Sequence, residues 1–369
     1  MAWSEWDISC MRLALELATR GEGAVEPNPL VGCVLAREGK VIAQGWHGKF
    51  GGPHAEVVAL ANSPTGAARG CTAYTTLEPC SHVGKTPPCA EALIQAGVAR
   101  VVVAQGDPFP LVNGGGVARL RAAGIAVEIG CLEQAAAELN APYLTLLNQK
   151  RPWVIAKWAM SLDGKIATHT GHSQWISGEA SRRMVHALRG RVDAILIGSG
   201  TAKHDDPLLT ARPPGPRLAT RIVFDSRAEL ASESQLVRTL ALAPLLIAAG
   251  PQAEPTHLAR LQAAGCEIWQ SQADSPGERC RELLAELGRR RLTNLLVEGG
   301  GTLLGTLFDE QLIDEVQIFI APKFIGGAAA ISPLAGIGLS EVGRESSFVS
   351  SHWEQLGEDL HFHGRLRTR

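Results

Sequence analysis

The sequence has no long apolar run, no secretion signal and no low-complexity tract. No apolar stretch approaches the length that crosses a membrane. The first ten residues, MAWSEWDISC, carry acids where a signal peptide would have a basic and then an apolar segment. We therefore expect a cytoplasmic protein without a membrane partner. The eight cysteines should then be reduced, so a group of them would indicate a metal or catalytic site.

A large charge of either sign is also missing. The formal net charge is −2, and no block of like charges is longer than Arg289 to Arg291. These three arginines follow an expected helix at 278–287, whose carbonyl end they would stabilise. Such a charge distribution argues against nucleic acid or an anionic membrane surface as the main partner.

What the sequence does have is enough length for two domains. Its first part alternates helix and strand patterns, which predicts a three-layer α/β domain. The expected strands cover 30–36, 40–46, 71–77, 100–106 and 125–130, and the expected helices cover 8–18, 54–61, 89–97 and 116–124.

A polar segment that contains Pro152 marks a change of pattern. We place the first domain at 1–147, a linker at 148–152 and the second domain at 153–369. The second domain is also expected to be α/β. Its strands are expected at 153–160, 194–198, 221–226, 245–250, 294–300 and 315–322.

Four residues of the first domain suggest a metal site with a proton carrier. His54 and Cys89 stand at expected helix starts, and Cys80 follows an expected strand. One imidazole and two thiolates would hold a tetrahedral zinc ion and leave one position for water. Glu56, two residues after His54, could move a proton between that water and a leaving amine. This is the scheme of the zinc deaminases, except that eight residues separate the two cysteines instead of two.

Two other interpretations of the zinc site remain open. A structural zinc would need a fourth protein ligand, which His47, His82 or Cys71 could supply. A non-catalytic zinc protein could also bind nucleotides as a sensor. The remaining cysteines are expected to be small core residues. They are Cys10, Cys33, Cys71, Cys131, Cys266 and Cys280.

The stretches NPLVGCV, PHAE and EPCSHVGKTPPC closely resemble the deaminase half of the bifunctional deaminase/reductases of riboflavin biosynthesis. The resemblance implies a cytidine-deaminase-like fold, one Zn²⁺ per chain and a small phosphorylated diaminopyrimidinone as substrate. It also implies that this half hydrolyses the pyrimidinone to the uracil. The implied substrate residues are Asn28, His47, His82 and Lys85. A nucleoside or tRNA deaminase is the alternative, but a polynucleotide partner would require a basic surface.

One position departs from that family. GDPFP has Phe109 where the family commonly has asparagine in Asp-Pro-Asn-Pro, although Asp107 is kept. A substrate contact at 109 is therefore not expected to follow the family pattern.

The second domain contains a glycine-rich turn between a strand and a helix, NLLVEGGGTLLGTLF. Such a turn can bind a diphosphate, but this one lacks the spacing of the Rossmann fingerprint. The stretches AMSLDGKIA, GHSQWIS, FDS and VEGGGT resemble the dihydrofolate-reductase-like half of the same enzymes, as does the stretch at 187–212. The resemblance implies NADPH-dependent reduction of the ribosyl group to ribityl.

The same resemblance supplies candidate residues for this half. The cofactor positions are Ala159, Trp175, Thr201, Asp205, Ser226, Gly300, Gly301, Thr302, Leu303, Leu304, Gly305 and Thr306. The substrate positions are Ser173, Arg189, Leu209, Arg212 and Glu298. Physically, Arg189 and Arg212 offer bidentate donors for a phosphate. Lys157, on an otherwise apolar strand, is a candidate proton donor. A homo-oligomer is also expected.

Overall fold

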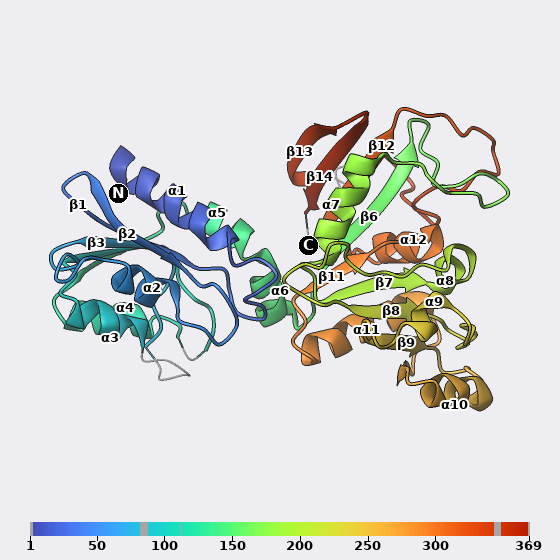
Figure 1. Ribbon diagram of the computed structural model, residues 1–369, viewed down its shortest axis with the longest axis horizontal. Helices are drawn as coiled ribbons and strands as arrows, with labels where there is room; N and C mark the ends of the chain where they lie inside the picture. Colours follow the sequence, from blue (N-terminus) through green and yellow to red (C-terminus); the bar gives the residue numbers. More distant parts are fainter. Residues whose placement is uncertain (1–2, 82–87, 111, 343–347, 368–369) are drawn as a thin grey trace. The chain divides into compact units, whose positions relative to one another are not determined.

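The computed structural model describes residues 3–81, 88–110, 112–342 and 348–367. The chain forms two compact units, Met1–Gln149 and Lys150–Arg369 (Figure 1). The expected linker at 148–152 covers the last two residues of a helix and the three residues before a strand. Within the described residues, every helix is too short or too polar to traverse a lipid bilayer.

The first unit contains a five-stranded sheet in the order β2-β1-β3-β4-β5. Strand β1 is antiparallel to both β2 and β3, whereas β3, β4 and β5 are parallel. The strands are β1 (Gly32–Arg37), β2 (Lys40–Trp46), β3 (Thr72–Leu77), β4 (Arg100–Gln105) and β5 (Ala126–Ile129). The helices are α1 (Glu5–Thr19), α2 (Ala55–Ala61), α3 (Cys89–Gln95), α4 (Gly115–Ala122), α5 (Glu133–Leu139) and α6 (Ala141–Gln149).

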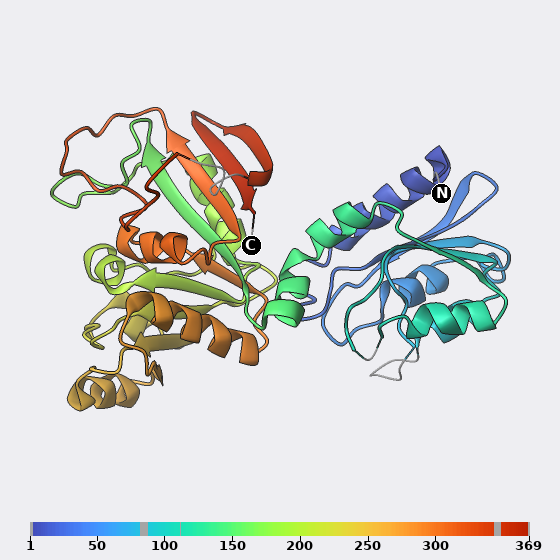
Figure 2. The same cartoon turned by 180° about the vertical axis from the view of Figure 1, so that it is seen from behind.

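Helices cover both faces of this sheet. Alternate residues of β1 point in opposite directions, so that Leu35 packs with α2, α3 and α4 while Val34 packs with α1 and α5. Figures 1 and 2 show these two helical layers from opposite sides. The predicted three-layer α/β arrangement is confirmed.

Helix α2 lies very close to the sheet because a glycine faces it. A Cβ atom on Gly45 of β2 would lie 2.4 Å from the carbonyl oxygen of Ala55. Only glycine permits this approach. It sets the position of the N-terminus of α2, where His54 and Glu56 stand.

The second unit contains a nine-stranded sheet in the order β10-β9-β8-β7-β11-β6-β12-β14-β13. Its seven strands from β10 to β12 are parallel, and β14 and β13 extend it in antiparallel fashion. The strands are β6 (Trp153–Ser161), β7 (Ala194–Gly198), β8 (Thr220–Phe224), β9 (Leu245–Ala249), β10 (Glu267–Gln270), β11 (Asn294–Val297), β12 (Glu315–Ala321), β13 (Phe348–Leu356) and β14 (Asp359–Leu366).

The helices of this unit are α7 (Glu179–Arg189), α8 (Ser199–Asp205), α9 (Gln235–Arg238), α10 (Pro255–Ala263), α11 (Pro276–Arg289) and α12 (Gly301–Asp309). Leucines of α11 and α12 form a core with apolar residues of the central parallel strands. The expected α/β character is confirmed. The sequence did not lead us to expect β10 or the hairpin of β13 and β14.

Candidate functional site

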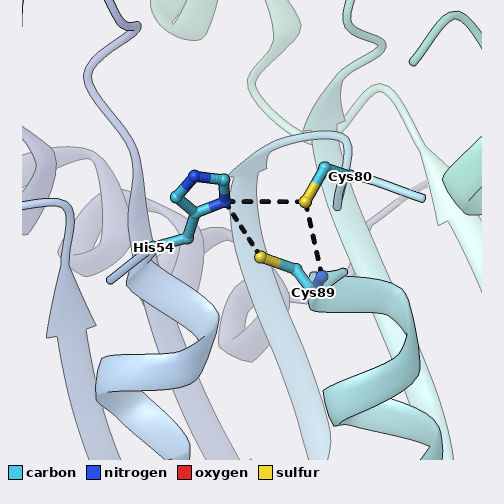
Figure 3. A group of neighbouring side chains, drawn as sticks. All are labelled: His54, Cys80 and Cys89. Atoms are coloured by element: carbon cyan, nitrogen blue, oxygen red, sulfur yellow. Dashed lines mark hydrogen bonds between the residues drawn. The ribbon is translucent and has the colours of Figure 1, made fainter. Parts of the chain in front are cut away.

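Three predicted metal ligands meet in the first unit (Figure 3). His54 is the N-cap residue of α2, Cys89 is the first residue of α3, and Cys80 lies in the loop after β3. The Nδ1 atom of His54 is 3.1 Å from Sγ of Cys89 and 3.6 Å from Sγ of Cys80. All three ligand atoms lie within 4.8 Å of one another, and no other such group is found among the described residues. They therefore converge on one point that an ion could occupy.

The chemistry of this donor set fits zinc, because an imidazole nitrogen and two sulfur atoms are its usual ligands. A hydrogen bond from the Cys89 side chain lowers the pKa of Cys80 to about 4, and the same contact raises the pKa of Cys89. The backbone N–H of Cys89 also donates to Sγ of Cys80 at 3.4 Å. The pair thus holds one thiolate readily, and a dication would stabilise the second.

Glu56 lies in the first turn of α2 and is buried beside this group. Burial raises the pKa of its carboxyl, and a contact with the Cys89 side chain acts in the opposite direction. Glu56 is therefore a buried acid in contact with one of the candidate metal ligands.

His47 is held by two hydrogen bonds next to the metal ligands. Its Nδ1 donates to the carbonyl oxygen of Pro53 at 3.0 Å, so Nε2 accepts from the Asn28 side-chain amide at 3.2 Å. Burial lowers the pKa of His47, which favours this neutral tautomer. The His47 ring is centred 5.4 Å from the His54 ring. Two predicted substrate residues thus border the metal group.

The alternative fourth ligands do not join this group within the described residues. His47 uses both ring nitrogens elsewhere, and Cys71 donates to the carbonyl oxygen of Ala67 at 3.1 Å. The predictions at His82 and Lys85 lie outside the described residues.

In the second unit, two of the predicted substrate residues bind each other. The guanidinium of Arg189, at the end of α7, donates to both carboxylate oxygens of Glu298 at 2.6 and 2.7 Å. Lys157 is half-buried on β6, where burial lowers its pKa and the neighbouring charge of Glu298 raises it. Arg189 is therefore already occupied by a carboxylate, whereas Arg212 is exposed.

The other predicted substrate residues are spread over two loops. Ser173 donates to the carboxylate of Asp205 at 3.3 Å. The side chain of Leu209 is buried. Leu209 can therefore support other residues of a site by packing under them, but its side chain offers no exposed surface to a ligand.

Several predicted cofactor residues follow the carboxyl ends of parallel strands. Thr201 comes after β7 and Gly300 after β11, and a Cβ on Gly300 would lie 3.0 Å from Oγ1 of Thr201. Ser226 follows β8 in the same way, while Ala159 is half-buried in β6. Ligands of open parallel sheets bind outside this edge. Trp175 is exposed, and the guanidinium of Arg182 lies 5.0 Å from its ring centre.

The predicted cofactor residues on α12 differ in what they could contact. Leu303 and Leu304 are buried in the core. A Cβ on Gly301 or Gly305 would lie 2.6 or 2.5 Å from backbone atoms of 332–336. Thr302 is exposed and Thr306 is half-buried. A cofactor could thus meet the start of this helix and its threonines, but not the two leucine side chains.

Comparisons with known proteins cover both units. Residues 4–105 match the model of the cytidine and deoxycytidylate deaminase zinc-binding region, and residues 152–362 match the RibD C-terminal domain. The chain is 40% identical over 357 residues to the riboflavin biosynthesis protein RibD of Aquifex aeolicus, an alignment that covers 96% of this chain and 97% of that protein. The chain belongs to the RibD family.

Solved RibD structures agree with this assignment. Acinetobacter baumannii RibD superposes with a TM-score of 0.86 at 35% identity, covering 98% of this chain and 99% of that one. A deaminase/reductase from Thermotoga maritima gives 0.84 at 33% identity, with the same coverage. RibD of Escherichia coli is 37% identical over 96% of this chain and 97% of its own length. The chain is a bifunctional deaminase and reductase of riboflavin biosynthesis. It has a zinc-binding deaminase domain and a reductase domain. The fold class predicted for each of the two domains is confirmed.

One residue near the candidate metal ligands was not predicted from the sequence. Glu78 is buried, and its carboxylate accepts hydrogen bonds from the backbone N–H groups of Gly114, Gly116 and Val117 at 3.0 to 3.1 Å. It ties the loop that carries Cys80 to the start of α4. The available signal was an acid directly before Pro79 and Cys80, but its partners are more than 30 residues away in the sequence.

Proposed function

We propose that His54, Cys80 and Cys89 hold one zinc ion and that Glu56 is the proton carrier of the deaminase. Zinc, when bound, supplies the positive charge that makes a water molecule acidic enough to react at neutral pH. Glu56 takes a proton from the attacking water and returns it to the amine that leaves as ammonia. The observation that carries this proposal is the convergence of three soft ligand atoms beside a buried carboxyl.

The proposed substrate of this domain is a diaminopyrimidinone with a phosphoribosylamino group. The Thermotoga maritima relative is described as a diaminohydroxyphosphoribosylaminopyrimidine deaminase, which supports this choice. Asn28 and His47, which border the metal group, would contact the pyrimidine ring. His82 and Lys85 would bind the phosphate, because both can donate hydrogen bonds to its oxygens.

In the reductase, NADPH is the proposed hydride donor and the phosphoribosylamino uracil is the proposed substrate. NADPH, when bound, would supply a hydride to C1 of the ribosyl group as the bond from C1 to the ring oxygen breaks. That oxygen would take a proton and become a ribityl hydroxyl. Lys157 supplies the proton, which its lowered pKa favours. The cofactor itself provides the hydride chemistry, so the remaining residues act mainly by positioning.

The proposal assigns the cofactor to the edge formed by Ala159, Thr201, Ser226 and the start of α12, with Trp175 and Asp205 beyond it. The sugar phosphate is assigned to Ser173, Arg212 and the Arg189–Glu298 pair, with Leu209 behind them. Deamination belongs to 1–147 and reduction to 153–369, joined by 148–152.

The protein is further proposed to be a cytoplasmic homo-oligomer. Phe348, Val349 and Trp353 on edge strand β13 are exposed, and unpaired strand edges with apolar side chains favour association. Light scattering after size exclusion measures the mass, and a monomeric mass would contradict this part.

The decisive test replaces Glu56 by Gln. E56Q should lower ammonia release from the diaminopyrimidinone by about 10²- to 10⁴-fold, because an amide cannot carry the proton. Zinc content and NADPH oxidation with the deaminated intermediate should be unchanged. E16Q, at an exposed position of α1, is the matched control. Full deamination by E56Q would contradict the proposed role.

A further inference from the structure

A phenylalanine lies beside the two candidate zinc thiols. Cys80, Cys89 and Val112 form a small buried cluster, against which the side chains of Val57 and Phe109 pack. This cluster is separate from the two larger cores on either face of the sheet. Its apolar side chains therefore pack next to the two cysteines and lie outside the main cores of the unit.

Local hydrogen bonds fix the position of Phe109. Its backbone N–H donates to the carboxylate of Asp107 at 2.9 Å, and its carbonyl oxygen accepts from the N–H of Val112 at 2.8 Å. The Asp107 carboxylate in turn accepts from the hydroxyl of Tyr143 on α6 at 2.9 Å. The backbone of Phe109 is thus held by hydrogen bonds while its ring packs against the cysteine cluster.

We infer that Phe109 shields the zinc thiolates from water and thereby slows the loss of the metal. The inference rests on the proposed zinc site. A zinc dication and two thiolates have no net charge, so an apolar wall beside them costs little. Such a wall lowers the local dielectric constant, which strengthens the attraction between the ion and the sulfur atoms. It also hinders water and competing ligands from reaching the sulfur atoms and the ion they hold.

The side chain of residue 109 has no hydrogen-bond donor or acceptor. It cannot hold a phosphate or a ring nitrogen by a side-chain hydrogen bond, and its ring packs against the buried cysteine cluster. If Phe109 acts by shielding, the rate of zinc release should depend on the polarity of the side chain at position 109 even when its size is kept constant.

The test compares F109L with F109N in the full, zinc-loaded chain. Leucine and asparagine have nearly the same shape, so both variants lose the ring and differ only in polarity. After removal of excess metal, zinc release to an excess of a coloured chelator is followed at fixed pH. F109N should release zinc about 10-fold faster than F109L, with the wild type slowest. I129N, an apolar-to-polar change at the exposed end of β5, should release zinc at the wild-type rate.

Equal release rates for F109L and F109N would overturn the inference while leaving the zinc site intact. A wild-type chain that purifies without zinc would overturn the proposed site and the inference together. The isosteric pair F109V and F109T repeats the comparison if asparagine prevents folding, which thermal melting of each variant reveals.

Discussion

Each of the two candidate sites contains a buried glutamate, and the pKa values of the two glutamates are shifted in opposite directions. In the deaminase, burial raises the pKa of Glu56 above its usual range, although the neighbouring His54 acts in the opposite direction. In the reductase, burial also acts to raise the pKa of Glu298, but the guanidinium of Arg189 outweighs it and holds that pKa below its usual range. The same residue type is thus the proposed proton carrier in one unit and part of a buried ion pair in the other. The environment decides the role, as the direction of each shift shows.

Metal removal gives the largest expected effect and separates the two units. Chelation of zinc should abolish ammonia release completely, because no group of the chain replaces the charge of the ion. NADPH oxidation with the deaminated intermediate should continue at the untreated rate. Parallel assays of ammonia and of absorbance at the NADPH band measure both. Equal loss of the two activities would show that the units are not independent.

Replacing Lys157 tests the proton donor on the reductase side. K157M should lower NADPH oxidation by about 10²-fold or more and leave deamination unchanged. A lysine donor must be protonated, so the rate should fall as the pH rises through its pKa. Because burial lowers that pKa from 10.5, the wild-type rate should already begin to decrease at a pH lower than 10.5 as the pH is raised. K157R should move this fall to higher pH, and an unchanged pH profile would exclude Lys157.

Breaking the Arg189–Glu298 ion pair tests whether the ionised carboxylate of Glu298 stabilises the second unit. E298Q leaves a buried guanidinium without its partner and should destabilise the second unit by about 3 kcal/mol, whereas R189M/E298L should recover much of this loss. The lowered pKa of Glu298 means that the pair stabilises the fold fully above pH 4.5 and progressively less as the pH falls through the folded-state pKa. Calorimetry at several pH values measures both effects. A melting temperature of E298Q equal to that of the wild type would contradict the assigned role.

The smallest expected effect concerns Glu78. E78Q removes the charge that accepts three backbone N–H groups at α4 and should destabilise the first unit by about 1–3 kcal/mol. Zinc should then be released faster, because the loop of Cys80 is less firmly held. E133Q, at an exposed position on α5, is the control. Unchanged melting and zinc release in E78Q would show that the loop is held by other contacts.

The zinc group could be predicted from the sequence because its parts are local. His54, Glu56 and Cys89 each stand at the start of a helix, and Cys80 follows a strand by a few residues, so periodicity placed all of them. The roles of Glu78 and Phe109 could not be derived in this way. Both depend on contacts with a loop or helix that only the folded chain brings near.

The reductase half was less accessible to sequence reasoning. Arg189 and Glu298 are 109 residues apart, and no pattern in the sequence predicts that they form an ion pair. The hairpin of β13 and β14 was missed because most of β13 is exposed and lacks the alternation of a half-buried strand. Leu303 and Leu304 matched cofactor positions by resemblance, but the structure places their side chains in the core.

The carbonyl oxygen of Pro53 has an effect two hydrogen bonds away. It fixes which nitrogen of His47 carries the proton, and this in turn makes Asn28 turn its amide nitrogen toward the histidine. The amide oxygen of Asn28 is then left as a pure acceptor. If Asn28 contacts the pyrimidine as proposed, a backbone group that no side-chain substitution can remove would favour ligands that present an N–H there, such as an amino group.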